Sequence, residues 1–341
     1  MDTLTHIAVG ACIGEIFLGG KLGRKALLWG ALAQSIPDVD VVSALWTGPA
    51  EHLLAHRGFT HSILFAALTT PFMALIAHHW HRAQDIPFSR FAWFFGTEIL
   101  LHIGLDALNS YGTGWFEPFS HERVMFNVIY VADPFFAIAP GVALLVLLVP
   151  PWRQRWRAVL PSLALVIAAA YLALCAVHKY RMEREVRRML QVQGITYDRL
   201  LVTPTPLNNW LWYIVTADDS VCRVGFRSVL DRADTLIMHA HSRNMEALGP
   251  IASDPQVRLL RRFAQGFDTV ERRGDELVFN DLRFGQIMGW RDPGGPFVFH
   301  WSLTGSQDRL TVQRGRFTGW DKAGMRSFIR RIRGDQATSR R

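Results

Sequence analysis

Residues 158–177 read AVLPSLALVIAAAYLALCAV and contain no charged side chain over 20 positions. A transmembrane helix needs about 20 consecutive, mainly apolar residues to cross the hydrocarbon core of a bilayer. A second stretch of this length runs from His61 to Trp80. These two stretches predict an α-helical polytopic membrane protein.

Other apolar stretches extend this prediction. Phe91–Leu108 and Phe135–Pro150 are good candidates for further spans. His6–Gly19 and Ala26–Ile36 are too short to cross at a rise of about 1.5 Å per residue. They would form a paired hairpin buried against the other helices, or thin the bilayer locally. We therefore expect about four to six membrane helices.

The second half of the chain has a different composition. Residues 1–178 carry 10 Lys+Arg and 11 Asp+Glu, whereas residues 179–341 carry 27 and 18 and have a net charge of +9. The mean hydropathy of +0.12 therefore averages two unlike halves. We expect a helical membrane domain over residues 1–180, a linker helix over 181–200, and a small soluble domain over 201–335.

The soluble domain is expected to be α+β or mostly β. The charged stretch Lys179–Gln193 should continue the last membrane helix, and Thr203–Pro206 should break it. One amphipathic helix is predicted over Gln256–Gln265. Runs rich in aromatic and β-branched residues predict five strands, over Trp210–Ala217, Cys222–Phe226, Thr235–Ala240, Glu276–Phe279 and Pro296–Leu303.

Composition also bears on partners and processing. The three cysteines form no legible disulfide framework. The basic residues of the second half are scattered and no nucleic-acid motif occurs, so we expect no nucleic-acid partner. A basic domain beside anionic lipid headgroups is the simpler interpretation. Met1–Thr5 lacks a positively charged region, and we therefore expect no cleaved signal peptide.

Histidines and aspartates lie near the ends of the apolar stretches. An ionised carboxylate near hydrocarbon costs about 2.5–3.5 kcal/mol, so it needs a partner or a metal ion. Imidazole and carboxylate together are the ligands of hydrolytic metal ions. Seven such residues fall within the first 106 positions: His6, Asp38, Asp40, His56, His61, His102 and Asp106. We interpret them as a metal site at one face of the membrane.

Two short motifs carry this interpretation. His102 and Asp106 are four residues apart and share a helix face, so both can bind one ion; the alternative is a buried His–Asp hydrogen bond that joins helices. Asp38 and Asp40 follow Pro37. They can both face the metal, or one can bind it while the other supports a ligand from behind; a polar helix-terminating turn is the alternative.

The motif HRGFTHS at residues 56–62 is more specific. His56 and His61 flank a Gly-containing turn that opens a membrane helix, with Thr60 or Ser62 able to cap it. The start of that helix suits an anionic group, and Arg57 could take phosphate oxygens bidentately. A solvated loop is the alternative.

Two further residues depend on their surroundings. His6 gains a role only because the topology brings it to the same face as the other clusters. Glu98 lies one turn before His102, where it could act as a general acid or base or support a ligand. Pairing with Glu15 or with a backbone group would explain Glu98 equally well.

The path of the chain places all four clusters on one face. The loops of the opposite face carry eight basic residues, whereas the loops of the site face carry two, Arg57 and Arg123. Under the positive-inside rule, the metal site and the C-terminal domain are therefore expected to be extracytoplasmic. The run from Lys179 to Arg188, with five basic residues on the site side, argues the other way.

The combined pattern resembles the bacterial membrane-bound metal-dependent hydrolase family of the YdjM/YbcI type. The resemblance rests on MDxxTH at residues 1–6, PDxD at 37–40, HRGxTHS at 56–62, HxxLD at 102–106 and YGT at 111–113. It implies an inner-membrane protein and a distant similarity to the zinc-dependent phospholipase C and nuclease P1 group. In that group a His-x-x-x-Asp pair binds zinc, which here corresponds to His102 and Asp106. That group has further histidines and a glutamate that this chain does not fully match, so the number of ions stays open.

These features predict a metal-dependent hydrolase with a divalent cation, zinc being the leading candidate. His6, Asp38, His56, His61, His102 and Asp106 are the predicted ligands; Asp38, Asp40, Arg57 and Glu98 are the predicted catalytic residues. Membrane lipids are the expected partners, and a lipid or lipid-linked phosphoester (or ester) is the expected substrate. The sequence does not define an oligomeric state. The alternatives are a non-enzymatic membrane protein with a structural metal cluster and a partner-binding tail, or a metal transporter.

Overall fold

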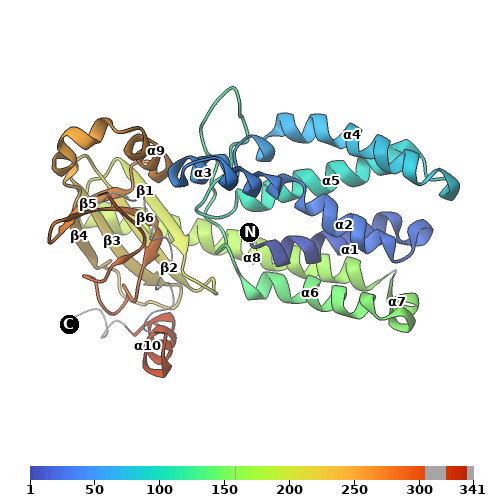
Figure 1. Ribbon diagram of the computed structural model, residues 1–341. Coiled ribbons are helices and arrows are strands. Elements are labelled where there is room, and N and C mark those ends of the chain that lie inside the picture. Colours follow the sequence, from blue (N-terminus) through green and yellow to red (C-terminus); the bar gives the residue numbers. More distant parts are fainter. Residues whose placement is uncertain (158, 304–319, 336–341) are drawn as a thin grey trace. The chain divides into compact units, whose positions relative to one another are not determined.

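A computed structural model describes residues 1–157, 159–303 and 320–335 (Figure 1). The chain forms two compact units. The first unit contains residues 1–46, 55–176 and 206–208, and the second contains 47–54, 177–205 and the chain from Asn209 onward. The first unit carries the sequence motifs discussed above.

The first unit is a bundle of helices. The site residues lie on α1 (Thr3–Leu22), on the 3-10 helices η1 (Pro37–Leu45) and η2 (Phe59–His61), and on α5 (Phe88–Asp106). The other helices of this unit are α2 (Lys25–Ser35), α4 (Ile63–Trp80), η3 (Arg82–Gln84), α6 (Pro134–Leu148), α7 (Pro150–Trp156) and the first part of α8 (Leu160–Val192). A core of buried phenylalanine and aliphatic side chains joins α1, α2, α4 and α5.

Glycines allow α1 and α2 to pack backbone to backbone. A Cβ atom on Gly30 would lie 2.0 Å from the carbonyl oxygen of Gly10, and one on Gly14 would lie 2.2 Å from the carbonyl oxygen of Ala26. Such small-residue contacts are typical of close helix pairs in membranes. The two short stretches at the start of the chain therefore form a paired hairpin, which was one of the two expectations for them.

In the described part of the chain, three helices are long and apolar enough to cross a membrane: α1, α4 and α8. A fourth span results if α6 and α7 count as one broken element, because they bend by 118° at their junction. The prediction that the first helix is too short is wrong, since α1 extends to 20 residues. Helix α5 is not among the three, and it carries Arg90, Glu98 and Asp106.

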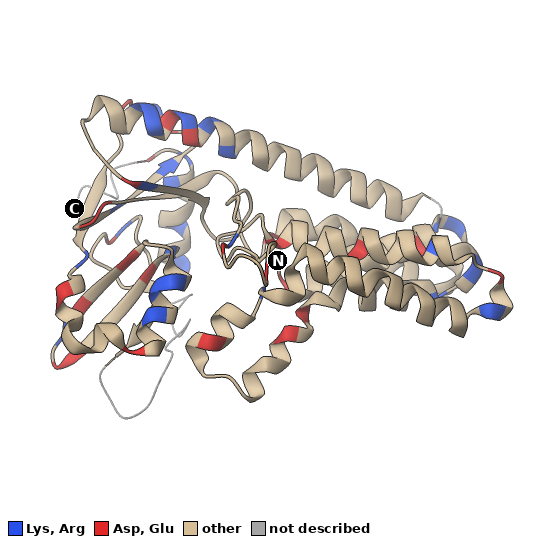
Figure 2. Ribbon diagram, turned by 90° about the horizontal axis from the view of Figure 1, so that it is seen from above, with Lys and Arg blue, Asp and Glu red and all other residues tan. Residues whose placement is uncertain are grey.

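The two ends of the bundle differ in charge. The turns between α1 and α2 and between α4 and α5, together with α7, lie at the end away from the N-terminus (Figure 1). Lys and Arg gather at that end, and the middle of the helices is nearly free of charge (Figure 2). The basic residues of these segments are Lys21, Arg24, Lys25, Arg82, Arg90, Arg153, Arg155 and Arg157.

The second unit contains two antiparallel sheets. One sheet has the order β1 (Arg199–Pro204), β2 (Leu211–Ala217), β3 (Val221–Ser228), β4 (Met238–Ser242). The other has the order β5 (Asp268–Arg273), β6 (Glu276–Gln286), β7 (Phe297–Ser302). The helices of this unit are α3 (Pro49–Ala55), η4 (Met245–Ser253), α9 (Pro255–Ala264), α10 (Lys322–Ile332) and the last part of α8.

All five predicted strands occur, with shifted ends, and the predicted helix is α9. Two strands were not predicted, β1 and β5, and neither were the helices α3, η4 and α10. Helix α8 does continue through the charged stretch, and its Val186 and Leu190 pack against Trp212 and Ile214. The expectation that Thr203–Pro206 ends this helix is wrong. The helix stops before Gly194, which has a positive φ of 67°.

Candidate metal centre

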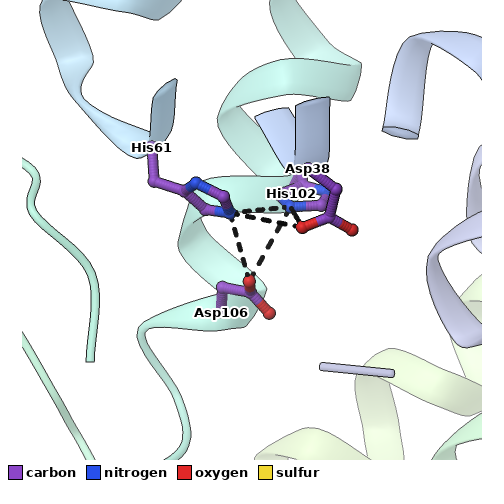
Figure 3. A group of neighbouring side chains, drawn as sticks. All are labelled: Asp38, His61, His102 and Asp106. Atoms are coloured by element: carbon purple, nitrogen blue, oxygen red, sulfur yellow. Dashed lines mark hydrogen bonds and ion pairs between the residues drawn. The ribbon is translucent and has the colours of Figure 1, made fainter. Parts of the chain in front are cut away.

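Four side chains from three segments of the first unit meet at one point (Figure 3). Pro37 begins η1 directly after α2 and places Asp38 in its first turn. His61 ends η2, and the hydroxyl of Ser62 then caps α4 by accepting from the amide of Phe65 at 3.0 Å. His102 and Asp106 are one turn apart on α5. The helix cap and the turns around the site therefore fix the backbone positions of the four residues.

The ligand atoms have the spacing of a metal site. His61 Nε2 lies 3.2 Å from His102 Nε2 and 3.4 Å from Asp106 Oδ2, and His102 Nε2 lies 3.7 Å from that oxygen. Asp38 Oδ1 is 3.6 Å from each histidine nitrogen. A tetrahedral zinc ion with bonds of about 2.0–2.2 Å requires ligand atoms about 3.3–3.6 Å apart. The donor set and its dimensions therefore fit zinc.

The hydrogen bonds behind the histidines orient both rings toward this point. His102 donates from Nδ1 to the backbone carbonyl oxygen of Gln34 at 2.5 Å, and His61 Nδ1 lies 3.3 Å from Asp40 Oδ2. In a neutral imidazole, a proton on Nδ1 leaves Nε2 as a bare acceptor. Two bare nitrogens then face each other at 3.2 Å with carboxylate oxygens beside them. A metal ion would satisfy all of these acceptors at once, and such supporting bonds are characteristic of metal-binding histidines.

Three basic groups outside the four-residue cluster contact Asp106, and one of them, Arg57, contacts the oxygen that also faces the two histidines. Arg57 Nε forms an ion pair with Asp106 Oδ2 at 3.0 Å, and His6 Nε2 lies 3.2 Å from Oδ1. The amino group of Met1 also contacts Oδ1. The ring of His6 stacks on that of His102, with centroids 3.9 Å apart. His6 therefore lies behind the four-residue cluster and supports two of its members.

Arg57 is placed differently from its predicted role toward substrate. Its side chain is only 4% exposed, and its guanidinium donates to Asn109 Oδ1 at 2.9 Å and to the carbonyl of Met1 at 3.3 Å. Its backbone has a φ of 61°, in the left-handed region that is unusual for arginine. Arg57 thus forms an ion pair with Asp106 inside the protein. Asn109 helps to hold it, although no sequence motif singled out that asparagine.

Asp40 and His56 lie next to the cluster. Asp40 accepts from the amide of Arg57 at 2.8 Å and from the hydroxyl of Thr60 at 2.9 Å, and His56 Nδ1 lies 2.9 Å from its Oδ1. Burial raises the pKa of Asp40, but its bonds to His56 and His61 lower it more, so the pKa lies well below its usual range. A second group of potential ligand atoms comprises Asp38, Asp40 and His56. Asp38 belongs to both groups.

Glu98 is fully buried one turn away from His102. Neither of its carboxylate oxygens has a hydrogen-bond partner among the described residues, and the amide group of Gln34 is likewise unpaired there. Glu98 is in neither group of ligand atoms. Its predicted pairing with Glu15 does not occur, because Glu15 forms a buried ion pair with Arg153 at 2.6 Å.

The cluster opens toward solvent on the side of Asp38. Its side chain is 22% exposed, whereas those of His61, His102 and Asp106 are at most 1% exposed. The same 3-10 helix, η1, exposes apolar side chains: Val39, Val41, Val42, Leu45 and, directly after it, Trp46. Exposed apolar patches mark surfaces that meet a membrane or another apolar partner.

Comparison with known proteins agrees with this membrane context. The family model described as YdjM inner membrane protein matches residues 1–182. The inner membrane protein YbcI of Escherichia coli is 38% identical over 135 residues, which are 38% of this chain and 75% of YbcI. The protein YfhP of Bacillus subtilis is 27% identical over 226 residues, 64% of this chain and 66% of YfhP.

No solved structure gave a significant match to the chain. The family model nevertheless covers more than half of the sequence, including every residue of the cluster. Together with the apolar helices, it supports an inner-membrane location. The chain belongs to the YdjM inner membrane protein family.

Proposed function

We propose that this protein is a membrane-bound metal-dependent hydrolase that cleaves a phosphoester, or an ester, of a lipid or lipid-linked substrate. The observation that carries the proposal is the pair of histidine nitrogens facing each other at 3.2 Å, each ring fixed through Nδ1. Buried acceptors are costly unless a donor or a cation satisfies them, and a metal ion would do so for all of these atoms at once. A bound zinc ion would supply a nucleophile at neutral pH and polarise the substrate oxygen.

The residues divide into ligands and a group that faces the substrate. His61, His102 and Asp106 are buried and would hold the ion, which leaves a fourth position beside Asp38. Three protein ligands plus an open position are typical of catalytic zinc sites. Asp38, the partly exposed member, would orient the attacking water and accept its proton. Asp40 would hold His61, and Arg57 and His6 would hold Asp106.

The surroundings of the opening favour a lipid substrate. Leu45 is 83% exposed and Trp46 is 71% exposed, close in sequence to Asp38. Tryptophan is enriched at the interface between hydrocarbon and headgroups. A substrate that reaches the cluster from such a surface has its reacting group at headgroup level. We place this face outside the inner membrane, as the distribution of basic loops suggests.

One observation favours a second candidate function. If Asp38 also binds the ion, four protein ligands close the site, and closed four-ligand sites are usually structural. The protein would then be a non-enzymatic membrane protein with a metal that ties η1, η2 and α5 together.

Metal content and hydrolysis of matched variants test the proposal. Purified protein should contain about one or more zinc ions per chain, and the His102→Ala/Asp106→Ala double variant should lose zinc about tenfold or more. His121→Ala, an exposed histidine (61%) outside the cluster, is the control and should retain zinc. Asp38→Asn should retain zinc but lose phospholipid hydrolysis by about 10²–10⁴-fold. Wild-type protein that binds no transition metal after reconstitution would refute the proposal, and zinc lost in Asp38→Asn would favour the structural alternative.

A further inference from the structure

A groove of about 600 Å³ runs between α4 and α5. Among the described residues that line it, none is charged. The lining is formed largely by small and apolar side chains, including Ile63, Ala66 and Ala67 of α4 and Ala92, Gly96 and Leu100 of α5. Its opening faces outward, because Ile63 and Leu100 are about half exposed. The groove therefore offers an apolar, side-open channel in a helix pair of the membrane unit.

Small residues create this channel. A Cβ atom on Gly96 would meet the Thr70 side chain at 3.5 Å, which is ordinary contact distance. An added methyl group would therefore fit at Gly96, and the alanines that also line the groove leave it unfilled. Larger side chains at these positions would fill it. The groove follows from the sequence of this chain rather than from a gap between loosely packed helices.

One end of the groove lies at the same level along α4 and α5 as the candidate metal centre. Ile63 lies two residues after His61, and Leu100 lies two residues before His102. Ala66, next to the groove, packs with Ile99, Ile103 and Ile36, and Ile36 directly precedes the Pro37-Asp38 turn. This layer of side chains thus borders the groove through Ala66 and includes the residue that precedes the turn of Asp38.

The length of the groove matches one leaflet of a bilayer. From Phe88 to Leu100, α5 rises by about 18 Å at 1.5 Å per residue. Half of a hydrocarbon core of about 30 Å is about 15 Å. A hydrocarbon chain lying in the groove would therefore bring its headgroup to the level of His61 and His102. Water would be a poor occupant, since the lining offers few polar partners.

We propose that this groove binds a hydrocarbon chain of the substrate lipid and thereby positions the lipid headgroup at the metal centre. This inference rests on the proposed hydrolase function. It narrows the substrate to lipids with a chain long enough to fill the groove while the headgroup reaches Asp38. The soluble headgroup alone would lack this positioning and would be a poor substrate.

Photo-crosslinking in vesicles tests the inference. The full chain is reconstituted in vesicles of phosphatidylethanolamine and phosphatidylglycerol that contain phosphatidylglycerol with a photoactivatable group in mid-chain. Crosslinked peptides, identified by mass spectrometry, should concentrate in residues 63–71 and 88–100. Gly96→Trp, whose side chain would fill the groove, should lower this labelling by at least about fivefold, a loss that displacement of the chain would produce. Leu68→Trp is the matched control, because Leu68 is 61% exposed on α4 and does not line the groove.

Ala92→Phe provides a second way to fill the groove if Gly96→Trp does not fold. Equal labelling of wild type and both folded groove variants would overturn the inference, as would labelling spread evenly over all lipid-facing helices. Crosslinking needs no turnover, so His102→Ala should still label in the groove. If the purified protein contains no metal but crosslinking still occurs in the groove, the hydrolase proposal fails, whereas binding of a lipid chain in the groove is supported. If hydrolysis occurs but Gly96→Trp cleaves the lipid as fast as wild type, the groove inference alone fails.

Discussion

At the scale of single residues, the two carboxylates of the Pro37-Asp38-Val39-Asp40 turn have different roles. Asp38 faces the two Nε2 atoms, whereas Asp40 lies behind His61 and accepts from the backbone and from Thr60. Supporting carboxylates of this kind fix the orientation of a histidine ligand and raise its basicity. The position of Asp40 thus fits the proposed role of His61 as a metal ligand.

Replacing Asp40 should weaken metal binding without removing a ligand. Asp40→Asn keeps the size of the side chain but removes the charge behind His61, and we expect zinc affinity to fall by about 10–100-fold. Competition with a chromogenic chelator measures this affinity. Asp234→Asn, an exposed carboxylate (86%) far along the chain, should leave it unchanged. An unaltered affinity in Asp40→Asn would show that Asp40 only stabilises the turn.

The sequence could predict the residue types of the site but not all of their roles. His102 and Asp106 share a helix face, so their convergence follows from helix geometry alone. The bond from His102 to the Gln34 carbonyl involves the backbone, which leaves no signal in residue identity. The inward path of Arg57 depends on its positive φ, and this conformation is unusual for arginine. The contact of Arg57 with Asp106 was therefore not predictable from spacing.

At the scale of secondary-structure elements, the pairing of α1 with α2 positions two parts of the site. His6 lies on α1, and α2 leads through Ile36 into the turn that carries Asp38. Gly30 of α2 approaches the backbone of α1 at Gly10 and Gly14. A shift of either helix would therefore move both the support of Asp106 and the turn of Asp38.

A single methyl group should separate these helices. Gly30→Ala would place Cβ 2.0 Å from a backbone oxygen, and backbone atoms cannot move aside as a flexible side chain can. Overpacking of this kind costs about 1–3 kcal/mol or more, so we expect a lower unfolding temperature in detergent and reduced zinc content. Gly104→Ala, where no atom lies within 4 Å of the added Cβ, is the control. Equal unfolding temperatures for the two variants would show that α1 and α2 can move apart freely.

The elements themselves were predictable where one physical signal dominates. The uncharged run of α8 and the alternating strand β7 are examples. β1 was not predicted because Pro204 reads as a breaker, yet β1 is the edge strand of its sheet, where proline is tolerated. Pro150 ends the apolar stretch that begins at Phe135, and α7 turns away there by 118°. Hydropathy alone cannot locate such a bend.

At the scale of the whole molecule, charge is distributed to suit a membrane enzyme rather than a transporter. A transport path needs polar ligands through the depth of the membrane. Here the ligand groups lie at one end of the bundle, and Glu15, nearer the other end, is neutralised by Arg153. Glu98, which is buried and has no hydrogen-bond partner among the described residues, lies one to two turns from the cluster along α5. The arrangement therefore favours chemistry at one face.

The same charge distribution predicts how the protein lies in the membrane. The basic residues at the end opposite the cluster favour a cytoplasmic position for that end. The run from Lys179 to Arg188 carries less weight, because it opens a domain longer than about 60 residues, and such domains cross membranes largely regardless of charge. We therefore expect both the cluster and the second unit to be extracytoplasmic.

Cysteine labelling of intact cells tests this orientation. The native cysteines Cys12, Cys175 and Cys222 are buried, so their background should be low. His121→Cys, in the exposed loop after α5, and Asp234→Cys, in the second unit, should react with a membrane-impermeant maleimide before lysis. Lys25→Cys, exposed at the opposite end of the bundle, should react only after lysis. The reverse pattern would place the metal centre on the cytoplasmic side, and the lipid substrate would then have to come from the inner leaflet.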